Sequence, residues 1–146
     1  MDIKIKNIFK EGAIPPSLVA ESIAKHQVKT EIGGHGIFLG QIRADHRNGK
    51  NLTAMEFTTH TEMALEQAAI IREEVITKYA LTCAHFYHSI GEVKVGELCF
   101  FVFTSAPHRK AALDACAEMV ERFKKEVALW GKEIFEDNTH TWKENK

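Results

Sequence analysis

Residues 97–127 read ELCFFVFTSAPHRKAALDACAEMVERFKKEV and join a strand-like apolar run to a helical pattern. The first part, from Glu97 to Ser105, is rich in the aromatic and β-branched residues that favour strands. Pro107 fits the first position of a helix. Apolar residues then recur at helical spacing, as Leu113, Cys116, Ala117, Val120, Phe123 and Val127. The stretch therefore predicts a strand followed by a long helix.

The flanking sequence predicts further strands and two more helices. Gly91 and Gly96 bracket a short connection, so residues 82–89 are expected to pair antiparallel with residues 97–105. A helix is expected from Pro15-Pro16 to about Val28, and another after the capping-box pattern Thr59-His60-Thr61-Glu62. Strands are expected at 1–9, 37–43, 52–58, 133–136 and 139–143, with a charged loop at 44–50. Strand pairs separated by helices predict an α+β fold with a mainly antiparallel sheet and three main helices.

The composition is that of an ordinary globular protein. A length of 146 residues predicts one domain, residues 1–146. The net charge is −1, which argues against generic nucleic-acid binding. No apolar run approaches the roughly 18 residues of a membrane span, and the first residues lack a signal-peptide layout. Cys83, Cys99 and Cys116 have no CxxC spacing and lie in apolar patterns, so we expect reduced, buried thiols and a cytoplasmic protein.

Three potentially cationic residues crowd the expected start of the long helix: His108, Arg109 and Lys110. A helix N-terminus already carries partial positive charge and free N–H groups, so these side chains oppose the helix dipole unless an anion joins them. A phosphate or carboxylate would resolve this conflict. The alternative is that the side chains extend into water or pair with nearby acids.

Three further cationic residues are candidates for a functional site: Lys124, Arg43 and Lys132. Lys124 falls on the apolar face of the long helix, where partial burial would lower its pKa and suit it to proton transfer. The alternative is a lysine whose stem packs at the edge of the core while its amine stays in water. Arg43 ends a predicted strand and could reach a ligand or a neighbouring carboxylate. Lys132 could reach the region of Lys124, or be an exposed strand residue.

The sequence predicts neither a metal site nor a bound cofactor. Cys83, His85 and His88 suggest metal ligands, but on a strand residues 83 and 85 share one face while residue 88 points to the other. No GxGxxG, P-loop, GxSxG or HExxH pattern occurs, which argues against the usual nucleotide, hydrolase and zinc-protease sites.

The sequence contains, in order, Gly40-Gln41-Ile42-Arg43, Met63-Ala64-Leu65, His88-Ser89-Ile90-Gly91-Glu92, Ser105-Ala106-Pro107-His108-Arg109, and Lys124 followed by Trp130-Gly131-Lys132-Glu133. Taken together, these segments resemble the large, catalytic subunit of molybdopterin synthase over roughly residues 35 to 142. The last two segments are the most specific. The resemblance implies an α/β hammerhead fold and a dimer of this chain. That dimer would bind two small ubiquitin-like sulfur-carrier subunits, giving a heterotetramer.

The resemblance also implies a reaction and roles for the candidate residues. Each carrier would bring sulfur as a C-terminal Gly-Gly thiocarboxylate, and cyclic pyranopterin monophosphate would accept it to form the dithiolene of molybdopterin. Arg109, His108 and Arg43 would hold the substrate phosphate, and Lys124 would lie beside the thiocarboxylate. We expect Arg109 and Lys124, at the two ends of one helix, to line one cleft. The three cysteines need no role as nucleophiles, because the sulfur arrives on the partner.

Two positions depart from the family pattern. A lysine usually follows the tryptophan directly, but here Gly131 holds that place and Lys132 comes next, so Lys132 is a substitute candidate. Phe57-Thr58-Thr59-His60 replaces an expected Tyr-Glu-containing segment. Two alternatives remain open: a non-catalytic binding module for a phosphorylated metabolite, which leaves Lys124 unexplained, and a structural oligomer subunit.

Overall fold

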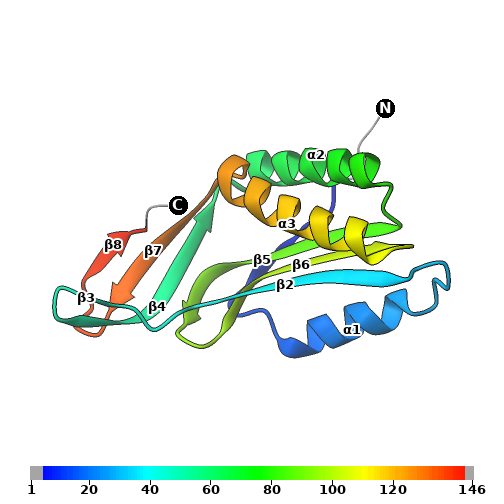
Figure 1. The fold of residues 1–146 in the computed structure, drawn as a ribbon. Helices are drawn as coiled ribbons and strands as arrows, with labels where there is room; N and C mark the ends of the chain where they lie inside the picture. Colours follow the sequence, from blue (N-terminus) through cyan, green and yellow to red (C-terminus); the bar gives the residue numbers. More distant parts are fainter. Residues whose placement is uncertain (1–4, 144–146) are drawn as a thin grey trace.

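The computed structural model describes residues 5–143, which form three helices and eight strands (Figure 1). The helices are α1 (Pro16–His26), α2 (Thr61–Tyr79) and α3 (Arg109–Glu126). The strands are β1 (Phe9–Glu11), β2 (Gly34–Gln41), β3 (His46–Arg47), β4 (Lys50–Thr59), β5 (Cys83–Lys94), β6 (Leu98–Ala106), β7 (Leu129–Phe135) and β8 (His140–Trp142). This content confirms the predicted α+β class with three main helices.

The strands form one sheet in the order β2-β6-β5-β4-β7-β8, with β1 beside β5 and β3 beside β4. Only β1 and β5 pair in parallel among the described strands, so the expected antiparallel character is confirmed. The long β5 links two halves: residues 83–88 pair with β6 and residues 91–94 pair with β4. The partner changes at Gly91, whose φ of +80° favours glycine. The predicted strand end at Ser89 is wrong, because β5 continues beyond this glycine.

Helices cover both faces of the sheet. Figure 1 shows α2 and α3 on one face and α1 on the other. Phe100 and Val102 of β6 belong to the core under α2 and α3, whereas Phe101 and Phe103 belong to a second core cluster with Ile14 and the partly buried residues of α1. A strand buried on both faces has no polar side to alternate with. This burial explains why the β6 sequence is apolar almost throughout.

The helix boundaries differ from the prediction at two N-termini. Helix α3 begins at Arg109, so Pro107 lies outside it and His108 is the residue that precedes its first turn. The buried face is also rotated: Leu113 is 56% exposed, while the neighbouring Ala112 is fully buried. At the start of α2 the Met63 N–H donates to the His60 side chain, which replaces the predicted threonine cap.

The ends of the chain and the charged loop also differ in detail. The expected first strand begins only at Phe9, and residues 1–4 lie outside the described part. The predicted charged loop contains β3, which turns back to β4 at Asn48-Gly49, both with positive φ. The final hairpin is confirmed as β7 and β8, and Trp130 and Gly131 belong to β7. No helix in residues 5–143 has the length and apolar character needed to cross a bilayer.

Candidate active site

Lys124 lies in the last turn of α3, against the start of β6. The residue is exposed as a whole, yet its Nζ lies 5.3 Å from the centre of the Phe100 ring. Burial of the amine lowers the pKa of Lys124, and the charge of Lys143 lowers it further, while Cys99 and Glu121 act in the opposite direction. A lysine with a lowered pKa holds more of its neutral amine near neutral pH, and the neutral amine is the form that acts as a base or nucleophile. The chemistry expected of this residue therefore has a physical basis.

A buried histidine lies below this lysine. His88 is 2% exposed, stacks on Phe123 at 5.6 Å between ring centres, and contacts the rings of Phe57 and Phe100. Its Nδ1 donates to the Ser89 carbonyl oxygen at 2.7 Å. Burial lowers the pKa of His88 to about 3, and the charge of Lys124 contributes to this shift. The amine of Lys124 therefore faces an apolar floor that carries no charge at neutral pH.

Arg43 lies at the same end of the sheet as Lys124. It follows β2 just beyond Gly40, and Gly40 is paired with Phe100. Its Nε donates to Asp45 Oδ1 at 2.6 Å and a second nitrogen to Oδ2 at 3.3 Å. The guanidinium thus reaches a neighbouring carboxylate, one of the two predicted outcomes, and this ion pair raises the pKa of Arg43. The side chain is 77% exposed, so an incoming anion has access to it.

Lys132 points away from Lys124. Its Nζ pairs with Glu56 at 3.2 Å and lies over the ring of Trp142. Side chains alternate across a strand, and a side chain at Gly131 would meet Met55 and Phe57 instead. Phe57 in turn contacts His88 under Lys124. The structure therefore puts position 131, and not Lys132, on the side of Lys124.

Lys143 is a nearby cation that the sequence reasoning missed. Its backbone N–H donates to the Gly131 carbonyl oxygen at 2.9 Å, directly after the Lys132–Trp142 pair in the hairpin register. Lys143 is thus the cross-strand neighbour of Gly131 and shares its face. Its charge acts on Lys124 and on Asp45, the partner of Arg43. The predicted hairpin did not give this pairing, because a turn of Asp137-Asn138 alone would set Lys143 opposite Lys132. The observed register pairs Lys132 with Trp142, and this shift by one residue sets Lys143 opposite the glycine that replaces the family lysine.

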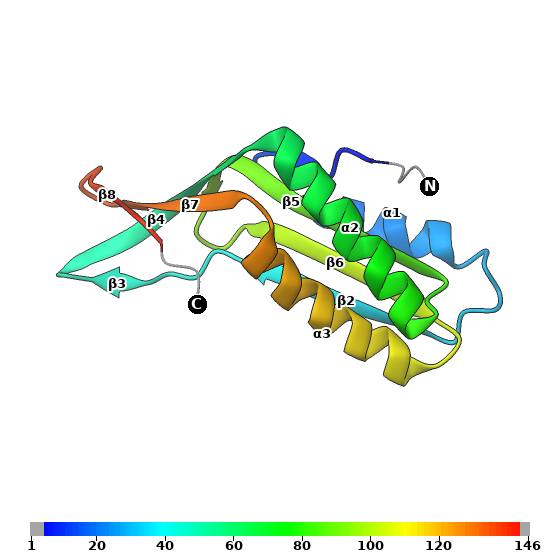
Figure 2. The same cartoon turned by 90° about the horizontal axis from the view of Figure 1, so that it is seen from above.

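His108 and Arg109 lie at the other end of α3. The Arg109 Cα is next to Gly34, the first residue of β2, whereas Lys124 contacts the far end of the same sheet. An α-helix rises about 1.5 Å per residue, so Arg109 and Lys124 lie roughly 22 Å apart along its axis. Figure 2 shows the two ends of α3 at opposite ends of the helical layer, one near β7 and the other near the far end of β2. The expected single cleft is therefore wrong for one copy of the chain.

The start of α3 still has the predicted anion-binding character. No acidic residue occurs in its first turn, and His108 makes no side-chain capping hydrogen bond. Lys110 pairs with Asp114 one turn on, at 2.9 Å, as one alternative predicted. The helix therefore presents free N–H groups with cationic neighbours, which is an arrangement suited to an anion.

Comparison with known proteins identifies the family. The family profile described as MoaE protein matches residues 15–126. The chain belongs to the MoaE family. The molybdopterin synthase catalytic subunit of Bacillus subtilis is 37% identical over 117 residues, which is 80% of this chain and 74% of that one. The subunit from Pyrococcus abyssi is 36% identical over 105 residues, which is 72% and 70% of the two chains.

Solved structures agree with this membership in the MoaE family. A crystal structure of molybdopterin synthase from Staphylococcus aureus matches with a TM-score of 0.83 and 26% identity, over 97% of this chain and 99% of that chain. A complex of subunits 1 and 2 of molybdopterin-converting factor from Helicobacter pylori shares the fold, with a TM-score of 0.79 and 17% identity over 94% and 90%. The resemblance found in the sequence, and the fold that it implies, are confirmed.

Proposed function

We propose that this chain is the catalytic subunit of a molybdopterin synthase, acting as one domain of residues 1–146 in the cytoplasm. The observation that carries the proposal is its identity of 36–37% to two molybdopterin synthase catalytic subunits over more than two thirds of the chain. The three cysteines Cys83, Cys99 and Cys116 are buried and free, which fits a reducing compartment.

The reaction transfers sulfur from a small carrier subunit to cyclic pyranopterin monophosphate. At each pterin carbon that gains sulfur, the thiocarboxylate sulfur forms the new bond while the bond from that carbon to oxygen breaks, and the oxygen leaves as water or on the phosphate. Water then cleaves the bond between that sulfur and the carrier's acyl carbon and restores the carrier's carboxylate. Lys124 stabilises the negative charge that develops as sulfur attacks, or moves the protons of this exchange. The Helicobacter pylori complex of two converting-factor subunits shows the same fold beside a partner subunit, which supports a carrier of this kind for the present chain.

Two copies of the chain supply the complete site. Arg43, Lys124 and Lys143 gather at one end of the molecule, and His108 and Arg109 at the other. A two-fold dimer brings opposite ends of two identical chains together at two equivalent places. The amines of one copy then face the sulfur, while the helix start of the second copy holds the substrate phosphate. Two carriers on this dimer give the proposed heterotetramer.

Reconstitution with thiocarboxylated carrier and pterin substrate tests the proposal. Wild-type protein should form the dithiolene product. The Lys124→Ala variant should lose product formation while it still folds and still binds the carrier, because only the charge at the reacting sulfur is removed. Lys125→Ala, the exposed neighbour on the same helix, is the matched control and should keep its activity. Full activity of Lys124→Ala would refute the assignment, and a wild-type chain without product would favour the binding module instead.

A further inference from the structure

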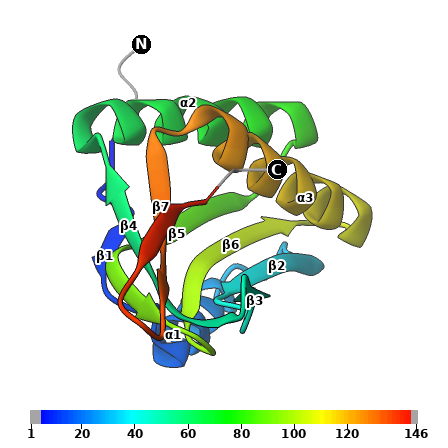
Figure 3. The same ribbon diagram turned by 90° about the vertical axis from the view of Figure 1, so that its left-hand side faces the viewer.

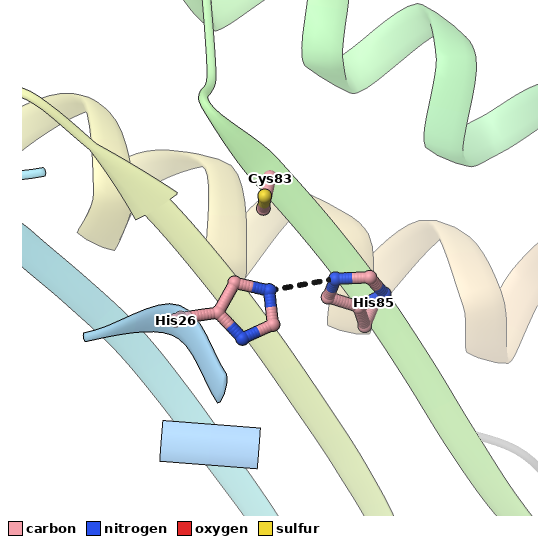
Figure 4. A group of neighbouring side chains, drawn as sticks. All are labelled: His26, Cys83 and His85. Carbon is pink, nitrogen blue, oxygen red and sulfur yellow. Dashed lines mark hydrogen bonds between the residues drawn. The ribbon is translucent and has the colours of Figure 1, made fainter. Parts of the chain in front are cut away.

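A cluster of two histidines and a cysteine lies on the sheet face opposite to Lys124. His26 is the last residue of α1, and Cys83 and His85 point toward it from the start of β5 (Figure 4). One ligand atom from each of the three residues lies within 4.8 Å of the others. His88 points to the other face, as the strand alternation predicts. The third residue beside Cys83 and His85 is instead His26, which the sequence did not associate with them.

The two imidazoles are oriented as ligands. The Nε2 atoms of His26 and His85 are 3.0 Å apart. His26 Nδ1 lies 2.7 Å from the Ser22 carbonyl oxygen, so Nδ1 carries the hydrogen and donates it. The Nε2 of neutral His26 is then left with a lone pair directed at His85. A backbone carbonyl that fixes the remote ring nitrogen is typical of histidines that bind metal through the other nitrogen.

The cysteine supplies a thiolate-forming group beside these rings. Cys83 is 6% exposed, and the Lys29 amine donates to its sulfur at 2.8 Å. The thiolate is the form of cysteine that binds metal. Lys6 and Arg72 also act on His85 electrostatically. These three cations disfavour a hard divalent ion held by charge alone, so the site suits an ion bound through strong nitrogen and sulfur bonds.

We propose that His26, Cys83 and His85 bind one Zn²⁺ ion, with a fourth position open to water. Tetrahedral zinc with bonds of about 2.0–2.1 Å to nitrogen and about 2.3 Å to sulfur separates two nitrogens by roughly 3.3 Å and a nitrogen from a sulfur by roughly 3.6 Å. To bind zinc, the distance between the two histidine Nε2 atoms must therefore increase by a few tenths of an ångström. The largest distance among the three ligand atoms must decrease by about 1 Å. The thiol proton leaves to solvent, and the His85 proton moves from Nε2 to Nδ1, so no oxidant or reductant is needed.

The bound ion would connect the end of α1 to β5. The proposal of this zinc site does not depend on the proposed sulfur transfer. The test uses the full chain loaded with Zn²⁺, then dialysed and assayed for metal and thermal stability, with Mg²⁺ as the comparison ion. We expect one tightly held Zn²⁺ per chain and a midpoint of unfolding that rises with Zn²⁺ but not with Mg²⁺. Loading with Co²⁺ should produce a sulfur-to-cobalt charge-transfer band. Absence of this band in the wild-type chain would overturn the proposal.

Variants distinguish this site from surface binding by other histidines. Cys83→Ser should abolish the charge-transfer band, and His26→Gln should weaken Zn²⁺ retention at least ten-fold. Cys116→Ser, which alters a buried cysteine of α3, is the matched control and should behave like the wild type. Equal Zn²⁺ retention by the wild type and by both site variants would overturn the proposal. Circular dichroism tests whether each variant is folded. If a variant is not folded, the Co²⁺ spectrum of the wild-type chain alone tests the proposed site.

Discussion

At the scale of the residue, His88 shows how burial sets a pH limit for this protein. The native histidine, enclosed by Phe57, Phe100 and Phe123, has a pKa of about 3, below its ordinary value of 6.5. Between these two values the unfolded chain binds more protons than the native one, so stability falls as the pH decreases through this window. His88→Phe should flatten that part of the curve.

The measurement is urea unfolding of the wild type and of His88→Phe between about pH 4 and pH 7, within the window that the shifted pKa defines. One pKa unit corresponds to about 1.4 kcal/mol, so the difference in slope is readily detected. His140→Gln, a change at an exposed histidine, should retain the wild-type slope. An unchanged slope in His88→Phe would show that this ring does not contribute to the acid sensitivity.

The second lysine of the site is also decided at this scale. Lys143 lies opposite Gly131 on the side of Lys124, whereas Lys132 pairs with Glu56 on the other face. Loss of one charge at a reaction centre commonly costs on the order of 100-fold in rate. Lys143→Ala should therefore reduce dithiolene formation strongly, and Lys132→Ala should have a small effect.

A rescue variant sharpens the Lys143 prediction. Adding Gly131→Lys to Lys143→Ala restores an amine on the same face, and its nearest obstacle is the flexible end of Met55. Activity should return in part. If Lys132→Ala proves the more damaging substitution, the assignment of Lys143 is wrong. Steady-state rates with a fixed amount of thiocarboxylated carrier provide the comparison.

At the scale of the element, α3 is held against β2 by the absence of a side chain at Gly36. A Cβ there would approach the Ala112 carbonyl oxygen to 2.5 Å and the Thr104 hydroxyl to 2.6 Å. Because one of these atoms is helix backbone, Gly36→Ala must displace α3, at a cost of about 1–3 kcal/mol. Gly40→Ala on the same strand meets its nearest atom only at 3.1 Å and should cost less. The denaturant midpoints of the two variants test this order.

The helices and strands were largely predictable from the sequence. The side-chain contacts between distant segments were not. The run from Cys99 to Phe103 indicated a strand, and its burial on both faces explains why it was so apolar. The opposite orientations of Gly131 and Lys132 followed from strand alternation once β7 was recognised. The meeting of His26 with His85 had no local signal, because it depends on how α1 packs across the sheet. Site geometry of this kind arises from tertiary contacts between distant segments.

At the scale of the whole molecule, the candidate site is divided between two ends. Figure 3 looks from the end at which β7 and β8 lie, beyond the C-terminal turn of α3. The mixed dimer of a Lys124→Ala chain with an Arg109→Ala chain tests whether two copies complete the site. One of its two sites would keep both residues, so about half of the wild-type activity should appear.

Each homodimer of a single variant serves as the control in that experiment, and both should be nearly inactive. A site contained in one chain would leave the mixed dimer inactive as well, because each chain would then carry one defect. Differently tagged chains, co-expressed and purified through both tags, give the mixed species. Product formation per dimer is the quantity to compare.

The length of α3 acquires a further meaning from this division. Helix α3 is rigid and carries the phosphate-binding residues at one end and the amine of Lys124 at the other. Its length therefore fixes the distance between these two groups. Inserting a single residue would lengthen it by about 1.5 Å and rotate one tip by about 100° relative to the other. Substitutions on the exposed side of α3 should be tolerated far better than insertions or deletions. Only insertions and deletions change the spacing between the reactive groups in the dimer.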